Sequence, residues 1–287
     1  MSTVSIDGSG TSRARCLLAP NPSLMTLDGT NTWLVAEPGS AGAVVVDPGP
    51  DDAGHLDRIA AAAEQAGQRI EQIVLTHGHA DHSAGAGRLA EVTGAPVLAV
   101  DPAYRRSGRV WGGRPPGLAL GADGLRPGAT VRAGGCELAV IETPGHTRDS
   151  VCLLLEADGA LLTGDTVLGR GTTVIADDGS LSDYLRSLDR LRALADEAGL
   201  RALLPGHGPM LADPAGTLDY YIAHRAQRMA AVETALGAGA TAVPDIVARV
   251  YTDVDPALWP FAEWSVRATL SYLAERGELP PGAALPE

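Results

Sequence analysis

The sequence predicts an α+β fold in which sheets are covered by helices, and three observations support this. Residues 31–207 alternate between short apolar segments of strand length and segments with helical periodicity. Apolar residues make up 45% of the 287 residues, so the chain can bury a large core. After Pro209 the alternation stops and only helical patterns remain. We therefore expect a large domain over residues 1–213 and a small helical domain over residues 214–287.

The strands and helices of the large domain are predicted from local patterns. Runs of apolar residues predict strands at residues 32–36, 43–47, 70–76, 96–100, 137–143, 151–156, 160–164 and 201–204. Helical periodicity predicts helices at residues 53–66, 83–93 and 181–198. The last of these carries leucines on one face, which indicates packing against a sheet.

The C-terminal segment predicts a small winged-helix-like unit. Residues 214–236 have a helical pattern, a Gly/Ala-rich linker follows at 237–240, and further helices are expected at 244–250 and from about Pro260. From Ala215 onward the segment holds five arginines and nine acids, a net charge of −4. A helix that reads a DNA groove is expected to be basic, so we expect no specific duplex-DNA binding and a structural or substrate-shaping role.

Charge and composition disfavour several classes of protein. The formal net charge is −13, which discourages non-specific binding of nucleic acid or anionic membranes. No apolar run approaches the ~20 residues of a membrane span, and the polar residues 1–5 lack the layout of a secretory signal. We therefore expect a cytoplasmic protein without a membrane partner. The three cysteines are too few for a disulfide framework and are expected to be buried thiols.

Histidine and aspartate follow the ends of four predicted strands. These residues are His77, His79, Asp81 and His82 after the strand at 70–76, then His146, Asp165 and His207 after three later strands. Imidazoles and carboxylates at neighbouring strand ends are the components of a rigid metal cage. A lone histidine is usually a packed or solvated side chain, but five of the seven histidines share this context. The other two, His55 and His224, are expected to be solvated helix residues.

The spacing within residues 77–82 suits two ions. His77 and His79 lie two residues apart in extended chain, so they share one face. Asp81 and His82 then fall where a helix begins, and they can reach a second ion while Asp81 also satisfies free helix N–H groups. Glycines beside the later histidines allow the sharp turns that aim a side chain at an ion.

This set of motifs resembles the metallo-β-lactamase superfamily over residues 31–207, in the expected order. The resemblance implies an αββα four-layer sandwich with the site at one edge. It implies one metal held by His77, His79 and His146, a second held by Asp81, His82 and His207, and Asp165 bridging the two. Asp47 matches a family position that supports a ligand histidine. A strand-end turn is the equally weighted alternative for Asp47.

Three segments narrow the resemblance to the branch called lactamase-β-2-like. They are the opening residues 21–32, the loop 169–174 and the winged-helix-like C-terminal segment. Members of that branch include endoribonucleases specific for single strands. The loop supplies Arg170, Thr172 and Thr173 as candidate substrate contacts.

The expected chemistry is hydrolysis by two divalent ions. Zinc is the default for a histidine-rich site, and manganese and iron are alternatives. Water that bridges two ions has its pKa lowered toward ~7, and the resulting hydroxide attacks a carbonyl carbon or a phosphorus. Asp81, which orients the hydroxide, and Asp165 are the candidate catalytic residues. No separate general acid is evident in the sequence.

Two substrate classes remain open. The first hypothesis is a phosphodiesterase or endoribonuclease acting on single-stranded nucleic acid. Besides the branch resemblance, it draws on the arginine-rich segment 104–114, with Arg105, Arg106 and Arg109 as candidate phosphate contacts. A solvated surface loop is the alternative interpretation of this segment.

The second hypothesis is a hydrolase of a small acyl ester, thioester or lactone, which the acidic surface favours. The glyoxalase-II type is disfavoured because the C-terminal segment has no lysine. A secreted lactamase is disfavoured by Asp165, where many such enzymes carry cysteine, and an oxygen-reducing di-iron protein by His79, where that group carries glutamate. A third possibility, a nucleic-acid-binding regulator, is disfavoured by the acidic C-terminal segment.

Overall fold

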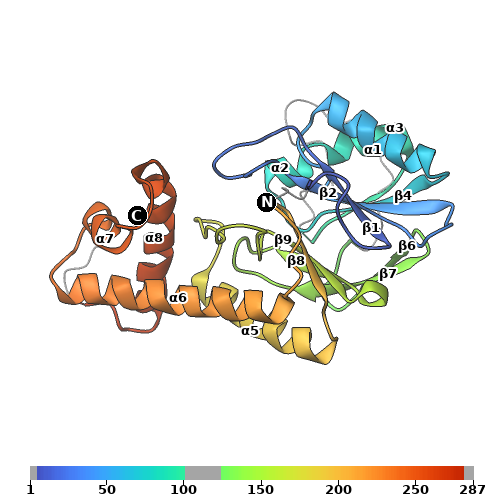
Figure 1. Cartoon of the computed structure of the whole chain (residues 1–287). Coiled ribbons are helices and arrows are strands. Elements are labelled where there is room, and N and C mark those ends of the chain that lie inside the picture. The colour runs from blue at the N-terminus through green and yellow to red at the C-terminus, as the bar shows by residue number, and fades with distance from the viewer. Residues whose placement is uncertain (1–4, 101–123, 281–287) are drawn as a thin grey trace.

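The computed structural model describes residues 5–100 and 124–280, in which two five-stranded sheets pack face to face between outer helices (Figure 1). The first sheet has the order β1-β2-β3-β4-β5, with β1 Ala14–Leu18, β2 Asn31–Val35, β3 Gly42–Val46, β4 Arg69–Val74 and β5 Val97–Leu98. The second has the order β10-β9-β8-β7-β6, with β6 Thr130–Ala133, β7 Cys136–Glu142, β8 Val151–Leu155, β9 Ala160–Gly164 and β10 Ala202–Pro205. Both sheets are mixed, because β3-β4-β5 and β9-β10 run parallel and the other pairs antiparallel.

Helices cover the outer face of each sheet. The first sheet packs against α1 (Ala53–Gln65) and α3 (Ala86–Thr93), with the short α2 (Ala80–Ser83) between β4 and α3. The second sheet packs against α5 (Leu181–Glu197), whose leucines face the sheet as expected. The expected αββα four-layer sandwich is therefore confirmed.

Strands inside the sheets are buried along their whole length because both of their faces are covered. All five residues of β3 and of β8 are buried. Between the sheets, Trp33, Leu138 and Leu204 belong to a single core cluster. This core holds the strand ends rigidly in place, and the strand ends carry the candidate ligands.

The C-terminal part is helical, as predicted. It comprises α6 (Pro214–Gly237), α7 (Val243–Val250), a short 3-10 turn at Pro256–Leu258 and α8 (Trp259–Glu275). The long α6 runs from beside α5 to the C-terminal helices (Figure 1). Leu218 near its start packs into the core under α5, whereas Leu236 near its end packs with α7 and α8. One continuous helix therefore ties the small unit to the sandwich.

Several elements differ from the prediction. The strands β1 and β6 were not predicted, and β5 is shorter than the expected 96–100. The helix expected at 83–93 is split into α2 and α3 at Gly85, where an added Cβ would lie 2.8 Å from both Leu56 and the Pro50 carbonyl oxygen. The Gly85 N–H donates to the Gly49 carbonyl oxygen at 2.9 Å instead of to a carbonyl of the preceding turn, so the hydrogen-bond pattern of one continuous helix is interrupted there.

Further predictions concern the cysteines, the membrane and the arginine-rich segment. Cys16, Cys136 and Cys152 are free and buried, as expected. Within the two described stretches, no helix has the length and apolar character to cross a membrane. The segment 104–114 with Arg105, Arg106 and Arg109 lies outside the described residues.

The prediction that His55 is solvated is wrong, since only 1% of this residue is exposed. Its Nε2 lies 2.9 Å from the Thr32 hydroxyl, which itself donates to the Asp47 carbonyl oxygen at 2.7 Å. His55 Nε2–H is therefore the donor to Thr32. Burial lowers the pKa of His55 to about 4, so the ring is neutral at pH 7.

We expect this buried ring to make stability fall in acid. In the unfolded chain His55 binds a proton near pH 6.5, whereas in the folded chain it binds one only near pH 4. The free energy of unfolding therefore keeps its full value above pH 6.5 and decreases as the pH falls from 6.5 toward 4. The variant His55→Gln keeps an N–H donor that does not titrate. Urea unfolding in chelator at pH 7 and pH 4.5 should show wild type losing about 2 kcal/mol more than the variant. An equal loss in both proteins would contradict this assignment.

Candidate metal centre

The seven predicted ligands converge at one edge of the sandwich. His77 follows β4, His146 follows β7, Asp165 follows β9 and His207 follows β10. The candidate ligands form three overlapping groups, within each of which the ligand atoms lie within 4.8 Å of one another. The groups are His77, His79 and His146; His77, His82 and Asp165; and Asp81, His82 and His207.

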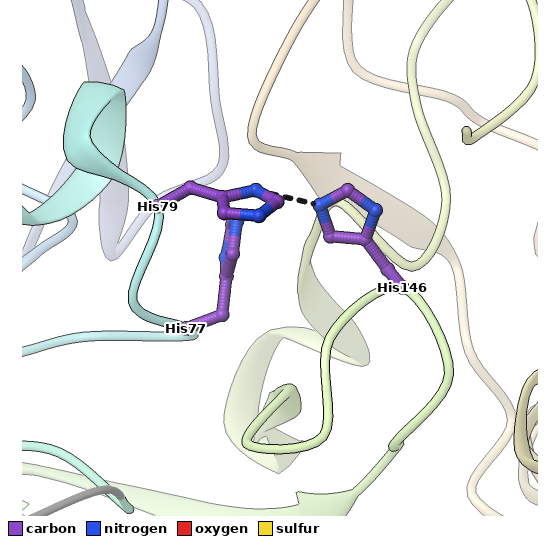
Figure 2. Close-up of side chains that lie close together, drawn as sticks. All are labelled: His77, His79 and His146. Carbon is purple, nitrogen blue, oxygen red and sulfur yellow. Dashed lines mark hydrogen bonds between the residues drawn. The ribbon is translucent and has the colours of Figure 1, made fainter. Parts of the chain in front are cut away.

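The first half of the cluster consists of three imidazoles that point toward one another (Figure 2). His79 Nδ1 lies 3.0 Å from His146 Nε2. The ring of His77 meets the rings of His79 and His146 edge-on, with centroids 4.7 and 5.0 Å apart. His77 Nε2 is buried and has no hydrogen-bond partner.

The second half adds two carboxylates. His82 Nε2 lies 3.2 Å from His207 Nε2, which is also 3.2 Å from Asp81 Oδ2. Asp165 Oδ2 is 3.3 Å from His207 Nε2 and 3.7 Å from His146 Nε2, so this carboxylate faces both halves. Its Oδ1 is buried and makes no hydrogen bond, although it lies 3.3 Å from His82 Nε2.

These contacts shift the pKa values within the cluster. Burial alone would raise the pKa of Asp165, but the imidazoles of His207 and His82 hold it well below its usual value. Burial would lower the pKa of His207, yet Asp165 and Asp81 raise it to about 9. Burial lowers the pKa of His77 well below its usual value. The carboxylate of Asp165 is therefore anionic at pH 7 and His77 is neutral, the protonation states in which both side chains can bind a metal ion.

The residues fit divalent ions. The orphaned atoms, His77 Nε2 and Asp165 Oδ1, are buried inside the ring of converging donors. Buried polar atoms normally have partners, and imidazole nitrogens and carboxylate oxygens are the ligands that zinc, manganese and iron accept. The donor set alone does not select among these metals.

A second layer of groups orients the imidazoles. His82 Nδ1 lies 2.9 Å from Asp47 Oδ2, His146 Nδ1 lies 2.8 Å from the Val174 carbonyl oxygen, and His207 Nδ1 lies 3.1 Å from the Gly29 carbonyl oxygen. With Nδ1 held in this way, Nε2 of each ring faces the centre of the cluster.

Asp47 both forms a strand-end turn and supports a ligand histidine, the two interpretations of this residue that the sequence allowed. It directly follows β3 with a positive φ of 53°, as a strand-end turn does, and its carboxylate is buried against His82. The same carboxylate accepts from the Thr76 backbone N–H at 2.8 Å and from the Thr76 hydroxyl at 2.7 Å. It therefore links β3, the end of β4 and a candidate ligand.

A cavity of about 320 Å³ borders His146 and Asp165. Its lining is largely apolar and comes from three parts of the chain: Leu24, Met25 and Leu27 near the N-terminus, Leu168 and Val174 beside β9, and Tyr251, Val254, Leu258 and Phe261 of the C-terminal unit. Pockets of this size accept small molecules.

The predicted substrate contacts of the loop 169–174 all line this cavity. Arg170 is paired with Asp28 at 2.8 Å. The Thr173 hydroxyl donates to the Asp165 carbonyl oxygen at 2.6 Å, so this hydroxyl is engaged within the protein. The remaining contact, Thr172, lines the cavity with its neighbours.

The family model described as the metallo-beta-lactamase superfamily matches residues 25–207 of this chain. The chain belongs to the metallo-beta-lactamase superfamily. A second model, the beta-lactamase associated winged helix domain, matches residues 242–278 and confirms the predicted winged-helix character of the C-terminal segment. The chain is therefore a metal-binding hydrolase of this superfamily with an appended winged-helix unit.

Curated relatives cover most of the chain. The beta-lactamase-like protein 2 homolog of Drosophila melanogaster is 31% identical over 272 residues, which span 92% of this chain and 88% of the relative. An atrochrysone carboxyl ACP thioesterase of Aspergillus fumigatus is 34% identical over 199 residues, spanning 68% of this chain and 56% of the relative. A metallo-beta-lactamase family protein of Thermus thermophilus shares the fold, with a TM-score of 0.73 at 24% identity, over 92% of this chain and 94% of the other.

Sequence reasoning missed two polar residues around the superfamily site. Asp178, in the loop before α5, has its Oδ2 2.9 Å from His79 Nε2. No sequence signal marks it, since it lies 99 residues from His79 in an ordinary turn-like tract. The expectation that His224 is solvated is wrong, because this residue is half-buried and lines the cavity beside Arg225.

Proposed function

We propose that this chain hydrolyses small acyl thioesters or esters whose acyl part is apolar. The observation that carries the proposal is the largely apolar cavity of about 320 Å³ beside His146 and Asp165. The thioesterase name of the Aspergillus fumigatus relative supports the same class of substrate. An apolar lining favours an acyl chain over a hydrated sugar-phosphate backbone.

The phosphodiesterase hypothesis has less support and stays an untested prediction. Arg105, Arg106 and Arg109 lie outside the described residues. Arg170, which lines the cavity, already has a carboxylate partner in Asp28.

We assign one divalent ion to His77, His79 and His146 and a second to Asp81, His82 and His207, with Asp165 facing both. When bound, such ions supply Lewis-acid activation of water and charge stabilisation at the carbonyl oxygen. Asp81 has the most exposed carboxylate of the cluster, at 30%, so it can accept a hydrogen bond from the attacking water. The apolar walls position the acyl chain and exclude other water.

The proposed reaction balances with water alone. The oxygen of water forms a bond to the carbonyl carbon, the carbon–sulfur bond breaks, and a proton released by the water ends on the thiol. The products are a carboxylic acid and a free thiol. An ester reacts in the same way, with an alcohol as the leaving group.

A substrate panel tests the proposal. Metal-loaded protein is assayed on the octanoyl and acetyl thioesters of N-acetylcysteamine, on bis-p-nitrophenyl phosphate and on single-stranded RNA. We expect the octanoyl thioester to give the highest kcat/KM. Efficient RNA cleavage with no thioester turnover would refute the proposal.

The apolar wall of the C-terminal unit should control acyl-chain length. We expect Phe261→Ala to raise KM for the octanoyl thioester by roughly tenfold, because an aromatic ring contributes about 1.5–3 kcal/mol of apolar contact. KM for the acetyl thioester should not change. Val92→Ala, at an α3 position that is 71% exposed, is the control and should match wild type on both substrates. Equal effects of Phe261→Ala on both substrates would contradict this role.

A further inference from the structure

Arg225 of α6 is a buried cation on the wall of the cavity. Only 6% of the residue is exposed, yet it lines the same cavity as His146 and Asp165. One of its terminal nitrogens donates to the Thr173 carbonyl oxygen, and its guanidinium lies 5.1 Å from the centre of the Tyr184 ring. Its Nε is buried with no hydrogen-bond partner.

The other two arginines of the cavity have carboxylate partners. Arg170 pairs with Asp28 at 2.8 Å, and Arg228 pairs with Asp253 at 2.8 Å. Within residues 5–100 and 124–280, no carboxylate pairs with Arg225. The cavity wall therefore carries one positive charge that the described part of the protein leaves without a counter-ion.

An unpaired buried guanidinium is costly, because it has lost water without gaining an anion. Arginine is also the side chain that best matches a carboxylate, because its planar guanidinium donates two parallel N–H hydrogen bonds. Thr173 links Arg225 to the metal cluster. Its hydroxyl donates to the Asp165 carbonyl oxygen, and its own carbonyl oxygen accepts from Arg225.

We propose that Arg225 binds a carboxylate on the acyl part of the substrate, so that the enzyme prefers apolar acyl groups that carry one negative charge. The inference rests on the proposed function for the bond that is cut. A single unpaired arginine in an apolar cavity suits a monoanion. A polyanion such as nucleic acid needs several free cations, and Arg170 and Arg228 are already paired.

Ligand binding tests this role without turnover. Isothermal titration calorimetry measures 5-oxohexanoate and 2-hexanone binding to metal-loaded wild type, Arg225→Met, Arg225→Lys and Arg192→Met; both ligands carry a carbonyl group that water cannot cleave, and only the first carries a carboxylate. Arg192, on α5, pairs with Asp219 and lies outside the cavity lining, so Arg192→Met is a charge-matched control. Thermal melts first establish that each variant is folded.

We expect wild type to bind 5-oxohexanoate, whose carboxylate lies three methylenes from its carbonyl group, at least about tenfold more tightly than 2-hexanone, as hydrogen bonds to a charged group allow. Arg225→Met should lose about this factor for 5-oxohexanoate and none for 2-hexanone, and Arg192→Met should match wild type. Unchanged 5-oxohexanoate affinity in Arg225→Met would mean that Arg225 does not bind the carboxylate and would overturn the proposal. If Arg225→Met does not fold, Arg225→Lys decides, since lysine lacks the two parallel N–H donors of the guanidinium, and unchanged 5-oxohexanoate affinity there overturns the proposal equally.

Turnover gives a second test. We expect wild type to prefer the glutaryl over the pentanoyl thioester of N-acetylcysteamine in kcat/KM, and Arg225→Met to lose that preference through KM. Equal losses on both thioesters would indicate a merely structural arginine and overturn the proposal. If neither thioester is cleaved but 5-oxohexanoate binding still depends on Arg225, the proposed reaction fails and the anion site stands.

Discussion

We expect Asp165→Asn to lower kcat on the octanoyl thioester by about 10³-fold, the size of effect that losing several kcal/mol of charge stabilisation produces. The change keeps the size of the side chain and removes its negative charge. Asp165 is the carboxylate that faces both halves of the cluster, 3.3 Å from His207 Nε2 and 3.7 Å from His146 Nε2. No other described carboxylate occupies that position.

The measurement is kcat together with metal content per chain. Asp196→Asn is the matched control, because this α5 carboxylate is 69% exposed and pairs only with Arg192 among the contacts described. The control should keep wild-type kcat and metal content. If Asp165→Asn retained full activity with full metal content, a bridging role for Asp165 would be wrong.

The second large effect is expected from Gly206→Ala, which changes no ligand. An added Cβ at this position would lie 2.5 Å from Asp165 Oδ1 and 2.7 Å from His82 Cε1. Real Cβ atoms do not approach other atoms so closely, so one or both ligands must move. We expect loss of bound metal and a fall in kcat of about 10²-fold, since small displacements of a catalytic group cost that much.

Gly237→Ala at the end of α6 is the control, because an added Cβ there meets nothing within 4 Å. It should leave metal content and kcat unchanged and should not destabilise the protein. Mass-spectrometric metal analysis and thioester assays compare the two variants. Wild-type metal content in Gly206→Ala would show that Asp165 and His82 do not need their present positions.

The candidate ligands were predictable from sequence because they lie in segments that follow strands, where local pattern and chemistry coincide. The run from His77 to His82 and the residues His146, Asp165 and His207 are brought together as expected. The glycines illustrate two different reasons. Gly145 has a φ of +142° and would place an added Cβ 2.3 Å from Tyr184 Cα, so both the turn and the packing against α5 require glycine. Gly206, in contrast, is needed only because Asp165 and His82 approach it closely.

What the sequence could not supply depends on contacts between distant segments. Asp178 reaches His79 across 99 residues, and His55 is buried because β2 and the chain after β3 pass over α1. The cavity also forms from segments that are distant in the sequence. Arg225 and Phe261 line it, but they lie on helices whose sequence patterns predict only packing. The first substrate hypothesis therefore rested on a branch resemblance and an arginine-rich segment, without knowledge of an apolar cavity.

The most direct test of the central claim is a metal titration of chelated protein, followed by thioester hydrolysis. Metal-free protein receives increasing equivalents of zinc, manganese or iron, and kcat on the octanoyl thioester is measured at each point. The seven-residue cluster predicts that kcat rises from background to a plateau at about two equivalents for at least one of these metals. Full activity in the metal-free protein, or no hydrolysis with any metal, would contradict a two-metal acyl hydrolase.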